Sequence, residues 1–217
     1  MVMDARSRRP RRLTRAVALI ASVSAVGGGA LGLAAGAASA SLLPTCAPRA
    51  TSTPFAPWGD HSSYFAMPGG TFESGAPNWA LDGASVVDGN ETSFVNAASD
   101  THSLAMPTGA VVVSPTVCVA MGENTIRLFV KNPGVASSTL HVQAYVQNPL
   151  TGLVLSTGFD VSGTSGPKGW SPTGRLLIPN LLGGVLGTQN LTLVFTTRGA
   201  PATWNIDDVF VDPFKSR

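Results

Sequence analysis

The stretch IRLFVKNPGVASSTLHVQAYVQ, residues 126–147, decides the fold class, because apolar and polar side chains alternate in two separate runs within it. Successive side chains of an extended chain point to opposite faces, so each run predicts a β-strand with one apolar face. The strands are expected over about 124–131 and 139–147, and Asn132-Pro133-Gly134 marks a turn after the first. This part of the chain therefore predicts an antiparallel β-structure.

The polar faces of these two strands form the first candidate binding surface. If the strands pair, one surface carries Arg127, Phe129, Lys131, His141, Gln143 and Tyr145. An aromatic ring such as Tyr145 can stack on a sugar, while Gln143 and Arg127 supply hydrogen bonds to its hydroxyls. An ordinary solvated face of an antiparallel sheet shows the same alternation of polar and apolar residues. The alternative is therefore that this surface binds no ligand.

Short β-prone runs continue along the chain between Gly, Pro and Asn residues. We expect further strands at about 70–73, 84–88, 103–106, 110–120, 152–160, 174–179, 190–197 and 203–212. This spacing, without a convincing helical period, is typical of sandwiches and barrels. The prediction is an all-β domain over 64–217, a two-sheet antiparallel β-sandwich (jelly roll), after an irregular, proline-rich entry segment over 41–63.

The N-terminal 40 residues have the three parts of a secretory signal peptide. Six arginines lie between Arg6 and Arg15, an apolar run extends from Ala16 to about Leu33, and Ala38-Ser39-Ala40 supplies the small residues at the cleavage site. A retained membrane anchor is the alternative, although Gly27-Gly28-Gly29 and many alanines make the run weakly apolar. We expect cleavage before Ser41 and a secreted, extracellular protein, by the general or the twin-arginine export route.

Removing this leader reverses the sign of the net charge. The full chain has 14 Lys and Arg against 12 Asp and Glu, but six of the basic residues and only one of the acidic residues precede Ser41. The mature chain therefore carries a charge of about −3, and its composition gives no reason to propose nucleic acid as a partner.

The two cysteines, Cys46 and Cys118, are expected to form a disulfide. Exported proteins meet an oxidising compartment, where disulfides form and persist. Two free thiols are the alternative. A metal-binding or catalytic role is not indicated, because neither cysteine has a histidine nearby in the sequence.

Two motifs at the ends of the domain carry a resemblance to a known family. The first is Pro68-Gly69-Gly70-Thr71-Phe72-Glu73-Ser74-Gly75, followed by Trp79, and the second is Trp204-Asn205-Ile206-Asp207-Asp208-Val209-Phe210-Val211-Asp212. Their order and separation resemble the galactose-binding-like jelly roll, and within it the cellulase-associated carbohydrate-binding modules. The resemblance implies a β-sandwich that binds an extracellular polysaccharide or a cell-surface glycan.

The same resemblance implies a structural Ca²⁺ site. In the family the first and last strands share the ion, and Glu73 with Asp207 or Asp208 match the acidic positions. Adjacent carboxylates near a third repel one another unless a cation lies between them, and oxygen ligands suit Ca²⁺. The alternative is that Asp207 and Asp208 point to opposite sides of a strand, one capping a turn and one facing solvent.

Trp170 is a further candidate ligand-binding residue, because the surrounding residues 163–174 are rich in Gly, Ser and Pro. Its ring is expected either to stack on a ligand or to fold back against the end of the sandwich. Sequence signatures of hydrolases and nucleotide-binding enzymes are absent, so we expect a non-catalytic module. A structural or surface-interaction sandwich without a sugar site is the main alternative, and a small hydrolase with an unrecognised site is the other.

Overall fold

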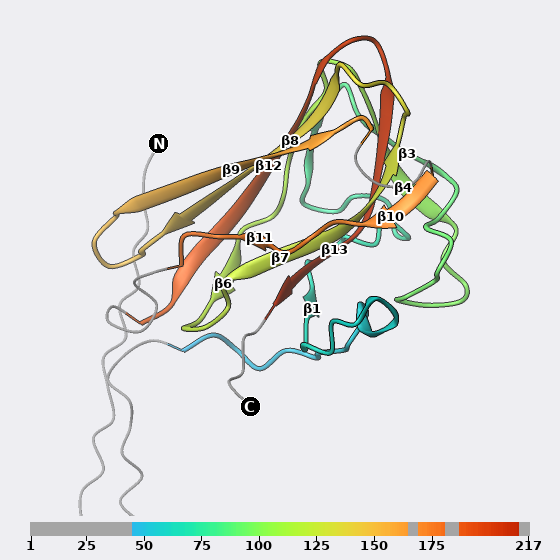
Figure 1. The fold of residues 1–217 in the computed structure, drawn as a ribbon. Helices are drawn as coiled ribbons and strands as arrows, with labels where there is room; N and C mark the ends of the chain where they lie inside the picture. The colour runs from blue at the N-terminus through green and yellow to red at the C-terminus, as the bar shows by residue number, and fades with distance from the viewer. Residues whose placement is uncertain (1–44, 165–168, 181–186, 213–217) are drawn as a thin grey trace, which may run out of the picture. The chain divides into compact units, whose positions relative to one another are not determined.

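The computed structural model describes residues 45–164, 169–180 and 187–212, which form β-strands and one short 3₁₀ helix (Figure 1). The predicted leader over 1–40 lies outside these residues. No helix among the described residues is long and apolar enough to cross a membrane. The elements are η1 (Ala56–Trp58), β1 (Phe65–Ala66), β2 (Ala80–Asp82), β3 (Ser85–Asp88), β4 (His102–Pro107), β5 (Val111–Val113), β6 (Val117–Val119), β7 (Thr125–Asn132), β8 (Ser138–Gln147), β9 (Val154–Ser162), β10 (Gly169–Pro172), β11 (Leu176–Leu177), β12 (Gln189–Gly199) and β13 (Thr203–Asp212).

The strands form two antiparallel sheets, which confirms the predicted all-β sandwich. The seven-stranded sheet has the order β10-β7-β13-β4-β3, with β1 also paired to β13 and β11 to β7. The six-stranded sheet has the order β2-β5-β12-β8-β9, with β6 also paired to β12. The last strand, β13, is therefore central in its sheet, with β7 on one side and β4 on the other.

The main core lies between the sheets and follows from the alternation seen in the sequence. On β8 every second residue from Leu140 to Val146 is buried, and the residues between them are not. These side chains meet Leu191, Leu193 and Phe195 of β12 and the apolar residues of the other sheet in one hydrophobic cluster. Two opposed sheets that each bury one face produce such a layer.

The predicted pairing of the first two strands is wrong, because β7 belongs to the seven-stranded sheet and β8 to the six-stranded sheet. The residues between them carry the chain across the sandwich. The run predicted over 110–120 is divided into β5 and β6 around Pro115, whose ring nitrogen has no hydrogen to donate to a ladder. Residues 70–73 lie in turns, while β1, β2 and β10 form where no strand is predicted.

The entry segment covers the outer face of the seven-stranded sheet. Phe55 and Tyr64 pack with Phe129 of β7 and Phe210 of β13 in a second aromatic cluster, in which the Phe55 and Phe129 rings lie 5.6 Å apart. For this reason β7 buries both its faces, unlike β8.

Asp60, in the entry segment, lies at the centre of a buried polar network between that segment and the seven-stranded sheet. Its carboxylate accepts hydrogen bonds from Arg127 at 2.8 Å, from two nitrogens of Arg175 at 2.5 and 3.1 Å, and from the Tyr64 hydroxyl at 2.6 Å. Burial alone would raise the pKa of Asp60, but bonds from Arg175, Tyr64 and Ser62 outweigh it, so the pKa lies well below its ordinary value. The carboxylate is therefore ionised in the folded protein.

The start of the entry segment is tied to the six-stranded sheet by a disulfide. Cys46 and Cys118 are bonded, with Cα atoms 5.6 Å apart, which confirms the predicted pairing. Arg49, three residues later, pairs with Glu123 and donates to the carbonyl oxygen of Cys118.

Candidate functional site

The outer face of the six-stranded sheet holds part of the predicted binding surface. Directly paired residues of an antiparallel sheet share a face. Each outward residue of β8 therefore lies in a row between one residue of β12 and one of β9. The three rows are Thr196-His141-Asp160, Val194-Gln143-Gly158 and Thr192-Tyr145-Ser156. Val113 and Val111 of β5 extend the first two of these rows beyond Val194 and Thr196. The face therefore combines one exposed ring, a few apolar side chains and many hydrogen-bonding groups.

Three of its polar side chains are linked in a row. One ring nitrogen of His141, Nδ1, lies 2.6 Å from Asp160 Oδ1, and the other, Nε2, lies 3.2 Å from Gln143 Oε1. Both side chains lean over Gly158, where an added Cβ would lie 2.7 Å from Gln143 Oε1 and 2.8 Å from His141 Cε1. A side chain at position 158 would displace both of them. The glycine therefore allows the side chains of His141 and Gln143 to lie flat against the sheet.

Tyr145 supplies the aromatic element. Its side chain points outward from β8 and is 42% exposed. Val154 of β9 is diagonal to it across the strand pair and is also exposed. An exposed ring of this kind can accept a flat apolar face of a ligand.

Arg127 and Trp170 do not belong to this face, which corrects the predicted ligand set. Arg127 is buried under the entry segment, where it bonds Asp60 and donates from Nε to the carbonyl oxygen of Thr173 at 2.8 Å. Trp170 lies on β10 opposite Lys131, and it packs partly buried against the aromatic cluster. Arg127 was expected on a free surface because the covering role of the entry segment leaves no periodic signal in its sequence. Trp170 was expected either to stack on a ligand or to fold back, and its ring is folded back against the aromatic cluster.

A second candidate site surrounds Asp208, at the irregular point of β13 where the register with β7 shifts between Asp207 and Phe210. Asp208 has a φ of 47°, a strained backbone conformation for a residue with a side chain. It is 1% exposed, and neither of its carboxylate oxygens has a hydrogen-bond partner among the described residues. Burial, with the charges of Glu91, Asp100 and Glu73, raises its pKa to about 7.

The neighbouring carboxylates have backbone partners. Asp207 accepts from the amides of Glu91 and Asp208, yet burial and the adjacent Asp208 charge raise its pKa to about 8. Glu73 accepts from the amides of Thr101 and His102 at 2.7–2.9 Å. Burial alone would raise the pKa of Glu73, but these bonds outweigh it and the pKa is lowered.

The sequence interpretation missed Glu91 and Asp100, both buried in the segment between β3 and β4. Glu91 accepts from the amides of Ser93 and Val95, and Asp100 accepts from Asn96 and Ala97. Their spacing is typical of acidic residues in loop turns, so only the fold relates them to Asp208. Across the parts of the chain that the structure describes, no three His, Cys, Asp or Glu side chains are already grouped as a metal ion would require.

No protein-family model and no curated protein sequence matches this chain. The solved structures that it resembles include a carbohydrate-binding module specific for non-crystalline cellulose, CBM28 (12% identity, 68% of this chain and 94% of that one, TM-score 0.45). They also include the CBM22-2 xylan-binding domain of Paenibacillus barcinonensis Xyn10C (16%, 66% and 97%, TM-score 0.41) and the K2 cleaved adhesin domain of Lys-gingipain (14%, 68% and 98%, TM-score 0.42). The likeness concerns the arrangement of the strands in a β-sandwich.

Proposed function

We propose that this chain is a secreted, non-catalytic module that binds a glycan on the outer face of β8, β9 and β12. The observation that carries the proposal is the exposed ring of Tyr145 beside the hydrogen-bonded row of Asp160, His141 and Gln143. Aromatic rings and planar amides are well suited to binding sugars, because a pyranose has an apolar face that stacks on a ring and a rim of hydroxyls that bond to an amide. The disulfide and the leader-like N-terminus support export from the cell.

The proposed face would bind a sugar without a large rearrangement of its side chains. A sugar ring stacks on Tyr145, and the hydroxyls of that sugar or the next one bond to the amide nitrogen of Gln143 and the exposed carboxylate of Asp160. His141 holds these two groups in place, because its ring nitrogens lie against Asp160 and Gln143. Side chains two residues apart on a strand are about 7 Å apart, so His141 to Tyr145 covers the length of a short oligosaccharide. Because Asp160 orients His141, which in turn touches Gln143, much of the ordering cost is already met in the free protein.

Tyr145→Ala is expected to weaken glycan binding about tenfold, because the stacked ring and its buried area are both lost. The measurement is a glycan array followed by calorimetry with the best ligand. Leu150→Ala is the matched control. Leu150 is 64% exposed at the β8–β9 turn, so this substitution removes an exposed apolar side chain elsewhere on the same hairpin.

Equal loss of binding in the two variants, or no binding by the native protein to any glycan on a broad array, would contradict the proposal. The second outcome favours the alternative of a structural or surface-interaction sandwich without a sugar site.

We propose that a structural Ca²⁺ binds at Asp208, as the family resemblance implies, and that the neighbouring carboxylates move toward the ion, because no three of them are grouped as a metal ion requires among the described residues. A carboxylate that is buried without a hydrogen-bond donor needs either a proton or a cation. Asp208 would provide the principal ligand, and Glu91, Asp100, Glu73 and Asp207 the surrounding negative charge. The ion would stabilise the link between β13 and the loop before β4 and would take no part in chemistry.

Adding Ca²⁺ to the metal-free protein at a hundredfold excess over its dissociation constant is expected to raise the melting temperature by about 5–10 °C. The effect should be larger at pH 8 than at pH 5. With raised pKa values of about 7 and 8, Asp208 and Asp207 favour the protonated folded state, so metal-free stability falls as the pH rises from about 4 to 8. Differential scanning calorimetry with EDTA or Ca²⁺ measures this.

Asp208→Asn keeps the shape of the side chain and should abolish the calcium response, while Asp160→Asn, on the other sheet, should keep it. A response that is the same in all three proteins would show that any Ca²⁺ effect arises away from Asp208.

A further inference from the structure

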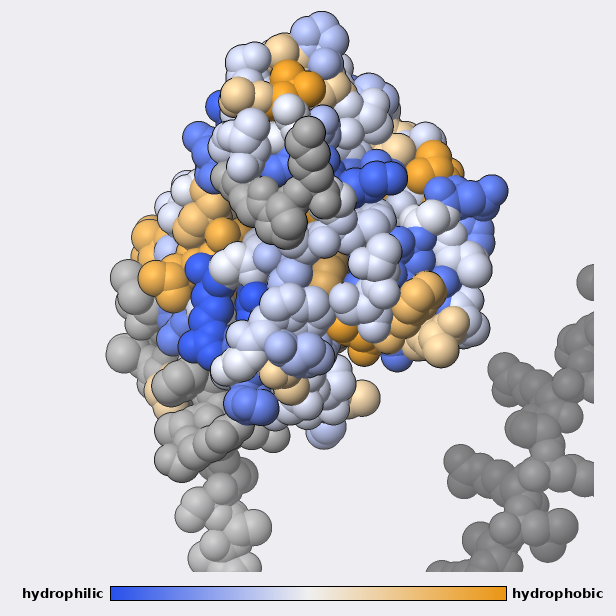
Figure 2. Space-filling model, turned by 45° about the vertical axis from the view of Figure 1, so that its right-hand side comes forward, coloured by the Kyte–Doolittle hydropathy of each residue, from blue (hydrophilic) through white to orange (hydrophobic). Residues whose placement is uncertain are grey.

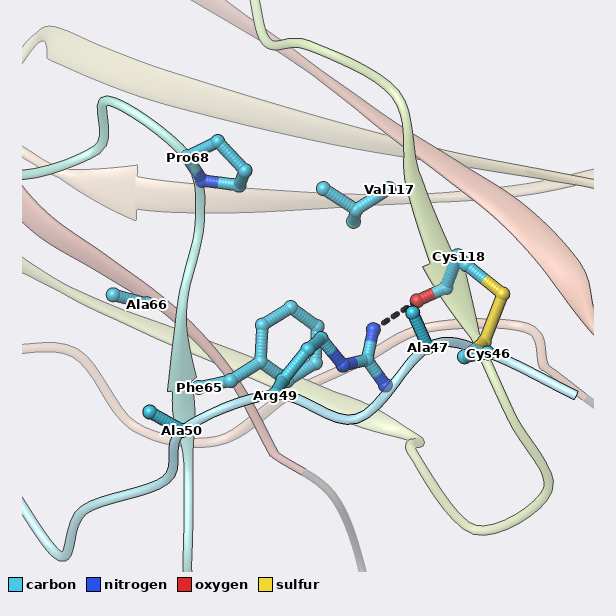
Figure 3. A pocket seen from close by; sticks show the side chains of 9 residues that line it. All are labelled: Cys46, Ala47, Arg49, Ala50, Phe65, Ala66, Pro68, Val117 and Cys118. Atoms are coloured by element: carbon cyan, nitrogen blue, oxygen red, sulfur yellow. Dashed lines mark hydrogen bonds between the residues drawn. A yellow bond between two sulfur atoms is a disulfide. The ribbon is translucent and has the colours of Figure 1, made fainter.

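An apolar pocket lies at the edge of the sandwich, away from both sites described above (Figure 3). It has a volume of about 420 Å³, within the range of small-molecule sites. Phe65, Ala66 and Pro68 line it from the side of the seven-stranded sheet, and Val117 with the Cys46–Cys118 disulfide lines it from the six-stranded sheet. The entry segment around Ala47 and Ala50 completes its wall.

Among the described residues that line the pocket, Arg49 is the one with a charge, and that charge is already neutralised. Its guanidinium donates to the carbonyl oxygen of Cys118 and forms an ion pair with Glu123. One face of the guanidinium lies over the Phe65 ring, 3.8 Å from the ring centroid, as Figure 3 shows. Because these partners use the nitrogen edges of the group, what it can offer a ligand is its other flat face.

We propose that this pocket binds a neutral, planar aromatic ring, such as a phenol or an indole. The pocket wall is apolar and its one cation is paired, so an anionic ligand would have to compete with Glu123 for Arg49. The flat face of a guanidinium stacks favourably on aromatic rings, and the alanine, proline and valine side chains accept the ring by contact alone. Ring shape and lack of charge are therefore the features that the pocket selects.

The site is distinct from the proposed glycan face in position and in chemistry. It lies between β1, β6 and the entry segment, whereas the glycan face is formed by β8, β9 and β12. On the surface that Figure 2 displays, hydrophobic residues stand in separate patches among polar ones.

The test is a titration of the purified protein with 4-fluorophenol at pH 7, where this phenol is neutral, followed by ¹⁹F NMR of the ligand and by methyl NMR of the protein. Saturable shifts are expected at Ala47, Ala50, Ala66 and Val117. Cyclohexanol, which has similar bulk but no flat π-system, should bind at least fivefold more weakly, and so should benzoate, which carries a charge.

Two variants make the result specific. Arg49→Lys keeps a cation for Glu123 but lacks the flat guanidinium, and it should weaken 4-fluorophenol binding about fivefold, the scale of one ring–cation contact. Ala50→Phe places a ring in the pocket and should block binding without lowering the melting temperature. Equal binding of fluorophenol and cyclohexanol, unchanged binding in both variants, or no methyl shifts up to the solubility limit would overturn the proposal.

Discussion

Replacing Asp60 with alanine is expected to lower the free energy of unfolding by about 3–5 kcal/mol, the usual cost of leaving one partner of a buried ion pair without the other. Arg127 would remain buried under the entry segment with its cationic head unpaired, and the Tyr64 hydroxyl would lose its acceptor. Urea denaturation at pH 7 measures the loss, through the transition midpoint at constant slope.

Asp160→Ala is the matched control for this prediction, because it removes a carboxylate from an ion pair whose acidic side chain is 66% exposed. Exposed pairs contribute at most about 1 kcal/mol, so the control should be nearly neutral. The lowered pKa of Asp60 sets the pH dependence. Its contribution is complete above the unfolded-state value of about 4 and is lost as the pH falls further, so variant and native protein should approach each other in strong acid. If both variants lost a similar free energy of unfolding at pH 7, the network around Asp60 would contribute no more to stability than an exposed ion pair.

Removing the disulfide by the double change Cys46→Ala and Cys118→Ala is expected to destabilise the protein by about 4 kcal/mol. The bond closes a loop with a sequence separation of 72 residues, and the loop-entropy relation gives this magnitude for the unfolded chain. Denaturant unfolding of the native protein in excess reductant should give the same midpoint as the double variant. A loss below about 1 kcal/mol in both would mean that the reduced chain still holds the entry segment near β6 when unfolded.

The alternating residues of β8 and β12 allowed the sandwich to be predicted, because a period of two is a local property that each strand carries by itself. Partner choice is different. No local feature of β7 indicates that its neighbours are β13 and β10 rather than β8, since its partners in β13, such as Asp212 opposite Thr125, lie up to 87 positions away in the sequence and meet it only in the folded sheet. The disulfide was predictable because two cysteines, in a chain expected to be exported, allow only one pairing.

The candidate site residues show the same difference between local patterns and contacts formed only in the fold. His141, Gln143 and Tyr145 share a face because they alternate on one strand. Arg127 was assigned to that face only through the wrong strand pairing. The burial of Arg127 depends on Asp60, an acidic residue in a proline-rich segment with no strand pattern, and the charge around Asp208 depends on Glu91 and Asp100 in an irregular loop. Sequence patterns do not report contacts of this kind between irregular segments and strands.

The position of β13 also sets the order in which this protein can acquire its structure. The seven-stranded sheet is centred on β13, the last strand described, which pairs with β1, β4 and β7, so none of these can complete its pairing before the part of β13 that it meets has been synthesised. The aromatic cluster over that sheet likewise joins Phe55 to Phe210. A chain with so many contacts between distant residues folds slowly and late. The seven-stranded sheet therefore closes only after the chain has been made through β13.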